Sequence, residues 1–157
     1  MSARGQDRRG NLVGFVLYAL ATQGKPPLTQ AELTRAIVAA FESPDGRSLA
    51  DGLDLPSPEL LGGLGEVIGA FGDWLRTQGI VEGCGFSRSG DALVCEFRAC
   101  LCLGVVDRLR AAQPDAVPPC VVVGLLAAFF QARGIRAEMA SFRRTDEGCE
   151  WQFALRR

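Results

Sequence analysis

The chain has 157 residues, which suits one domain with a single hydrophobic core. Hydrophobic residues make up 48% of it and its formal net charge is −1, which argues against global disorder and against a basic surface for nucleic acid. Histidine is absent, which removes Ser-His and Cys-His nucleophiles and imidazole metal ligands. We therefore expect a protein that is not an enzyme. We expect one domain over 1–157, with a helical half at 1–79 and a hairpin-helix-hairpin half at 80–157.

The N-terminus and the six cysteines bear on the compartment of the protein. A basic start followed by an apolar run, MSARGQDRRG and NLVGFVLYALA, suits either a signal peptide or a first helix after a polar tail. We favour the helix. No apolar run reaches the ~18 residues that are needed to span a bilayer. We expect a cytoplasmic protein with reduced thiols and no membrane span.

Helical patterns dominate the first half of the chain. We predict helices at 11–22, 30–42 and 58–78, with a loop at 43–57. Thr29 and Glu32 have the spacing of a capping box, which begins the second helix. Ser57 and Pro58 form a similar entry to the third helix, and Gly79 is expected to end it.

The hydrophobic pattern of the second half changes to the period of two that is typical of β-strands. We predict strands at 80–86, 92–99, 135–142 and 149–155, a short helix at 105–112 and an apolar segment at 120–130. That segment is either a buried helix or a strand. As a helix it would carry a row of small side chains, Cys120, Gly124 and Ala128, that suits close contact with a sheet, a ligand or a second copy. The order of elements predicts an α+β fold, an antiparallel sheet of two hairpins covered by helices.

A spaced set of residues runs through the last third of the chain. Its members are Cys120, Gly124, Gly134, Glu138, Gly148, Cys149, Trp151 and Phe153. In this set the region 80–156 resembles the 4-vinyl reductase, or hydrocarbon-binding, domain family. The family typically has Glu-x-x-Cys and a further Cys eight residues later. Here Ser141 stands in the place of the middle cysteine.

The resemblance implies a fold like that of the small subunits of the TRAPP vesicle-tethering complexes. It also implies a structural zinc ion, whose ligands here would be Cys120, Glu138 and Cys149. That site is incomplete, because a serine hydroxyl at 141 is a poor zinc ligand. Cys100 and Cys102 are candidates to complete it. The alternative is that the thiols are buried as small hydrophobic groups.

Regular strand geometry limits this set of ligands. Glu138 and Ser141 have opposite parity, so both reach one site only at a bulge or at the end of a strand. Cys149 shares its parity with Trp151 and Phe153, which should turn it toward the core.

The implied ligand is an apolar small molecule held between helices and sheet. We expect its pocket to involve Phe129, Phe130, Met139, Trp151 and Phe153, although such a group is more often simply core. The predicted function is a binding module that holds this molecule and signals to a partner protein, often as a homodimer. The alternatives are a TRAPP-subunit-like dimeric scaffold with a vestigial pocket and an auxiliary role in tetrapyrrole metabolism.

Overall fold

The protein is represented by a computed structural model that describes residues 29–56, 62–112, 114–115 and 117–156. The helix expected at 11–22 and the helix entry at Ser57 and Pro58 lie outside these residues. The helices are α2 (Gln30–Glu42), α3 (Pro44–Asp51), α4 (Leu64–Thr77), α5 (Leu103–Ala112) and α6 (Val121–Gln131). The strands are β1 (Gly83–Ser89), β2 (Ala92–Arg98), β3 (Arg136–Arg144) and β4 (Gly148–Arg156). Within these described residues, no helix has the length and apolar character needed to cross a membrane.

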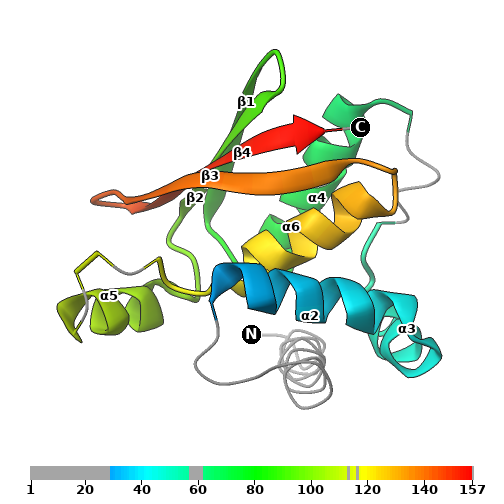
Figure 1. Cartoon of the computed structure of the whole chain (residues 1–157), viewed down its shortest axis with the longest axis horizontal. Coiled ribbons are helices and arrows are strands. Elements are labelled where there is room, and N and C mark those ends of the chain that lie inside the picture. The colour runs from blue at the N-terminus through cyan, green and yellow to red at the C-terminus, as the bar shows by residue number, and fades with distance from the viewer. Residues whose placement is uncertain (1–28, 57–61, 113, 116, 157) are drawn as a thin grey trace.

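The four strands form one antiparallel sheet in the order β1-β2-β4-β3. Each hairpin contributes two neighbouring strands, and the hairpins join where β2 pairs with β4, with Phe97 opposite Cys149. Alternate residues of the two central strands are buried on one face, the face toward the helices. This confirms the predicted α+β fold with an antiparallel sheet of two hairpins. Figure 1 shows the helices gathered on one side of that sheet.

Helix α6 lies between the sheet and α2 (Figure 1). Every residue from Val122 to Phe130 is buried, because α6 has neighbours on both sides. The ambiguous apolar segment is therefore a helix. A Cβ placed on Gly124 would lie 2.4 Å from Cδ1 of Ile37, so this row of small side chains serves close contact with α2. In the helix-to-helix contact, Ile37 takes the space that a larger residue at 124 would need.

The ends of several helices follow the expected chemistry. Thr29 and Glu32 form the predicted capping box: the Glu32 N–H donates to Oγ1 of Thr29, and the Thr29 N–H donates to the Glu32 carboxylate. Gly79 and Gly134 follow α4 and α6 with φ of 66° and 67°. Glycine adopts this left-handed conformation without the cost that a side chain would bring.

Two predictions about the first half were wrong. Residues 44–51 of the expected loop form the short helix α3. Its entry has the same chemistry that we had assigned to Ser57 and Pro58: Pro44 is the first helical residue and Oγ of Ser43 accepts from the N–H of Gly46 at 3.0 Å. Helix α4 begins at Leu64 instead of 58, and Gly63 is its N-cap. Glycines at a helix start weaken the helix there, which favours the later entry.

Candidate functional site

Four cysteines meet where β2 leads into α5. Cys100 and Cys102 precede α5, Cys120 is the N-cap of α6 and Cys149 is the second residue of β4. Hydrogen bonding with Cys102 shifts the pKa of Cys100, and hydrogen bonding with Cys100 and Cys120 shifts the pKa of Cys102. Cys149 lies within electrostatic range of Cys100. We call Cys100, Cys102, Cys120 and Cys149 the thiol cluster.

A strained backbone residue brings the first two cysteines into this cluster. Ala99 has a φ of 47°, in the left-handed region that costs a non-glycine residue about 1–2 kcal/mol. The N–H of Ala99 donates to the carbonyl of Glu147 at 3.0 Å, and the N–H of Leu101 donates to the carbonyl of Ile80 at 2.9 Å. These bonds hold the turn that carries Cys100 against the sheet. Strain of this kind is found mainly where the surrounding structure fixes a site.

Backbone N–H groups also affect two of these thiols. Hydrogen bonding by the Cys102 N–H lowers the pKa of Cys100, and hydrogen bonding by the Val121 N–H lowers that of Cys102, although larger effects raise both pKa values. The second donor belongs to the first turn of α6, the positive end of the helix dipole. Both bonds favour the thiolate form of the sulfur that accepts them.

A buried glutamine positions the third cysteine. Gln30 is 3% exposed. Its Oε1 accepts from the N–H of Cys120 at 2.5 Å, and its Nε2 donates to the carbonyl of Cys120 at 3.2 Å. The sequence analysis did not identify Gln30, because a polar residue in the first turn of a helix is ordinary. Its partner lies ninety positions along the chain.

The thiols of Cys100, Cys102 and Cys149 are neutral, because their pKa values are raised. Burial raises the pKa of Cys149 to about 11, and nearby Cys100 adds to this shift. The hydrogen bond from Cys100 favours the thiolate of Cys102, but the bond to Cys120 and burial outweigh it and raise the pKa of Cys102 to about 12. The hydrogen bond to Cys102, followed by burial, raises the pKa of Cys100 well above its ordinary value. Neutral buried thiols are poor nucleophiles, so this arrangement does not suit cysteine catalysis.

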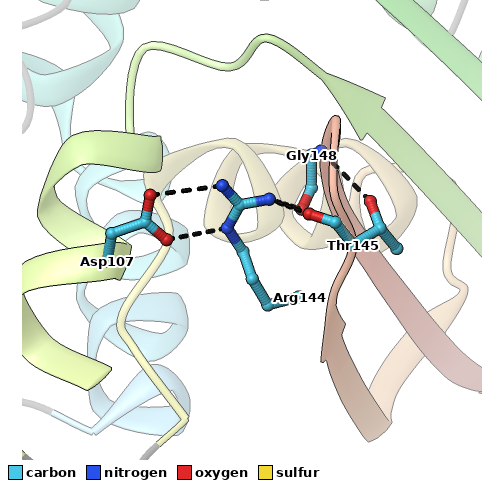
Figure 2. Close-up of polar contacts among 4 residues, drawn as sticks. All are labelled: Asp107, Arg144, Thr145 and Gly148. Carbon is cyan, nitrogen blue, oxygen red and sulfur yellow. Dashed lines mark hydrogen bonds and ion pairs between the residues drawn. The ribbon is translucent and has the colours of Figure 1, made fainter. Parts of the chain in front are cut away.

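An arginine links α5 to the β3–β4 hairpin beside the cluster (Figure 2). Nε and Nη2 of Arg144 donate to the two carboxylate oxygens of Asp107 at 2.8 Å and 3.2 Å. Nη1 donates to the carbonyl of Gly148 at 2.8 Å and to that of Thr145. Arg144 stands opposite Cys149 in the sheet, so it places a positive charge next to the cluster. Its hydrogen bonds also hold the pKa of Asp107 below its ordinary value.

Replacing Arg144 with glutamine should destabilise the protein more than the same change at Arg143. Arg143 pairs with Glu150 on the other face of the sheet, and such surface pairs contribute about 0–1 kcal/mol. Arg144 also donates charge-assisted bonds to two backbone carbonyls, so we expect the difference to be roughly 1–2 kcal/mol in the free energy of unfolding. Urea unfolding of both variants at pH 7 measures it. Equal urea midpoints for the two variants would show that the bonds from Arg144 to the backbone do not add to stability.

The same comparison has a pH dependence. The folded-state pKa of Asp107 is depressed, so the Asp107–Arg144 pair contributes its full stability above the unfolded pKa and loses it as the pH falls through the lower folded value. The difference between wild type and Arg144→Gln should therefore narrow below the ordinary carboxyl pKa of 3.8.

Glu138 and Ser141 do not reach the thiol cluster. Glu138 and Ser141 point to the same face of the sheet, because a bulge lies between Met139 and Ser141. Without a bulge, their opposite parity would place them on opposite faces. The face that they share is the outer one: Glu138 stands opposite Ala154, whereas Cys149 is buried on the inner face. Glu138 instead pairs with Arg156 at 3.1 Å. The expected set of Cys120, Glu138 and Cys149 is thus not brought together, because its carboxylate lies on the opposite side of the sheet.

Of the two candidates for completing the site, Cys102 interacts with Cys120, and Cys100 interacts with Cys102. Across residues 29–56, 62–112, 114–115 and 117–156, no three histidine, cysteine, aspartate or glutamate side chains form a group that could hold a metal ion.

Four of the five expected ligand-binding side chains lie in the hydrophobic core. Phe129, Phe130, Trp151 and Phe153 are each at most 4% exposed. The fifth, Met139, is 37% exposed on edge strand β3, directly opposite Phe153. Of these five side chains, Met139 alone is exposed at the surface.

Trp151 has an unusual polar atom. It is fully buried and its ring packs on Phe142 with centroids 4.5 Å apart, but its Nε1–H has no hydrogen-bond partner among the residues that the structure describes. Trp74, the other tryptophan, donates from Nε1 to the carbonyl of Leu53 at 2.9 Å. A buried donor without an acceptor costs about 1–3 kcal/mol, so most proteins avoid one.

A cavity of about 390 Å³ lies elsewhere, at the end of α6. Its described lining residues are Gln131, Gly134, Ile135, Arg136 and Arg156. None of the five expected ligand-binding residues is among them. Its charged rim also differs from the apolar pocket that was expected.

Comparison with known proteins found no matching family model, no significantly similar curated protein and no significantly similar solved structure. The resemblance to the 4-vinyl reductase domain family therefore stays an expectation from the sequence.

Proposed function

We propose that the protein is a non-enzymatic binding module for an apolar small molecule that carries one hydrogen-bond acceptor. The observation that carries the proposal is the Nε1–H of Trp151, which is buried between the sheet and the helices and has no partner within the described part of the chain. A bound acceptor would remove the cost of this orphan donor, and the surrounding aromatic side chains would bind the rest of the molecule. In this proposal the module passes the bound state of the molecule to a partner protein.

Access to this donor is proposed at the edge of the sheet. Met139 is exposed on β3, lies opposite Phe153 and adjoins the bulge that interrupts the β3–β4 ladder. A methionine is flexible and adapts to apolar ligands, and a bulge at a sheet edge is a common place for a strand to change shape.

The test uses Trp151 as its own reporter. The chain has two tryptophans, so Trp74→Phe leaves Trp151 as the only one. We expect 2-naphthol, which has an acceptor oxygen, to quench this fluorescence and to bind roughly 5–10-fold more tightly than naphthalene, which has none. In Trp151→Phe, with binding measured by calorimetry, the preference for 2-naphthol should disappear.

Native mass spectrometry of the full chain, purified under reducing conditions, accompanies this titration. A co-purifying apolar molecule that is lost in Trp151→Phe would support the proposal. A protein that emerges without any small molecule and binds the two probes equally, or not at all, would refute it. A dimer without any bound small molecule would favour the alternative of a dimeric scaffold.

A further inference from the structure

We infer that the cavity at the end of α6 binds a small organic anion, whose carboxylate group is held by Arg136 and Arg156. The cavity has a volume of about 390 Å³, which lies within the ~300–1,000 Å³ that is usual for small-molecule sites. Trp151 is not among its described lining residues. The inference is therefore independent of the proposed function, which concerns the indole of Trp151.

The pairing of β3 with β4 places the two arginines together. Arg136 is the first residue of β3 and stands directly opposite Arg156, the last residue of β4. Directly opposed residues of an antiparallel pair have Cβ atoms about 4.5–5.5 Å apart, and two like charges at this separation are destabilising. Both arginines line the cavity, where the chain passes from α6 into β3 beside the end of β4 (Figure 1). An anion between them would replace this repulsion with two charge-assisted interactions.

Charge is the second step of the argument. Nε of Arg156 pairs with Oε2 of Glu138 at 3.1 Å, and both side chains are exposed. Within the described part of the chain, Arg136 has no ion pair. Two guanidinium groups and one carboxylate leave a net charge of +1 at this edge of the cavity. That charge matches the single negative charge of a carboxylate, and the planar guanidinium matches its shape.

The other lining residues suit an organic molecule better than a bare ion. Ile135 contributes apolar surface beside the arginines. Gln131 is held by Glu42, which is not a described lining residue: Nε2 of Gln131 donates to Oε1 of Glu42 at 3.2 Å. A Cβ added to Gly134 would meet nothing within 4 Å, so the turn leaves open space in front of it. The carboxylate of the ligand would therefore lie at the arginines and its apolar body against Ile135.

The test is a fluorine NMR titration of the full chain with para-trifluoromethylbenzoate at pH 7 and low ionic strength. The neutral control ligand is para-trifluoromethylbenzamide, which has nearly the same shape. We expect the benzoate to bind roughly tenfold more tightly than the amide, because only the benzoate has a charge for the arginines to bind. Added salt should weaken the binding of the benzoate, because the arginines are exposed and their charges are screened.

Variants of single residues assign the binding to this cavity. Arg136→Gln should weaken binding of the benzoate by about fivefold or more. Arg143→Gln is the matched control, because Arg143 lies on the same strand but pairs with Glu150 and does not line the cavity, and it should leave the affinity unchanged. Glu138→Gln removes the carboxylate that competes for Arg156, so it should tighten binding by about threefold. A merely structural role of these residues would not produce that gain.

Several results would overturn the inference. These are equal affinities for the benzoate and the amide, no binding of either ligand, or equal affinities of the Arg136→Gln and Arg143→Gln variants for the benzoate. Binding of the benzoate that is lost in Trp151→Phe would place the ligand at the other site and would also overturn it. Tighter binding of phenyl phosphate than of the benzoate would overturn the assignment of a carboxylate. Circular dichroism checks that each variant is folded, and Arg136→Lys, which keeps the charge but not the planar fork and should bind with intermediate affinity, replaces Arg136→Gln if that variant is not.

Discussion

Gly148→Ala is expected to destabilise the protein by about 3 kcal/mol or more, a large part of the stability of a domain this size. Gly148 is buried at the start of β4, opposite Arg98 of β2. A Cβ at this position would lie 1.9 Å from the carbonyl oxygen of Phe97 and 3.0 Å from Cα of Arg98. These are backbone atoms of a paired strand, so the clash can be relieved only if the β2–β4 ladder opens. Urea unfolding followed by far-UV circular dichroism measures the loss.

Gly85→Ala is the matched control for this change. Gly85 is an exposed residue of β1 in the same sheet, and a Cβ there would meet only the side chain of Glu96, at 3.7 Å and beyond. That is ordinary contact, and alanine restricts the unfolded chain more than glycine does. We expect Gly85→Ala to be neutral or slightly stabilising. If the two variants unfolded at the same urea concentration, the close approach at Gly148 would not matter for stability.

The fold was largely predictable from local patterns. The alternation of Cys149, Trp151 and Phe153 predicted which face of β4 is buried, because a strand has a period of two. Periodicity did not distinguish helix from strand for α6, which has apolar neighbours on all sides. The short helix α3 was missed because its polar composition resembles a loop. Its entry at Ser43 and Pro44 was the available signal.

The candidate site was less predictable, because it depends on two local irregularities. The left-handed conformation of Ala99 turns Cys100 back against the sheet, and alanine seldom adopts it. The bulge after Met139 decides that Glu138 and Ser141 share a face, but only the pairing with β4 decides that this face is the outer one. Neither feature has a signature in one sequence. The separation of Glu138 from the cysteines therefore required the structure.

Gln30→Met should lower the free energy of unfolding by about 1–3 kcal/mol, the cost of leaving one buried backbone group unpaired. Methionine has nearly the shape of glutamine but cannot accept a hydrogen bond from the N–H of Cys120. The carbonyl of Cys120 still accepts from the N–H of Gly124 at 3.2 Å. In the variant, only the N–H of Cys120 therefore loses its hydrogen-bond partner. Amide hydrogen exchange should show the Cys120 N–H exchanging faster in the variant, in addition to the shift in urea midpoint.

The control for Gln30 is Gln152→Met, the same substitution on the exposed outer face of β4, which we expect to change stability by less than about 0.5 kcal/mol. Gln30 is the link by which α2 holds the backbone of Cys120, so the Cys120 N–H should exchange faster in Gln30→Met and at an unchanged rate in Gln152→Met. Equal exchange rates in the two variants would mean that Gln30 does not protect the start of α6.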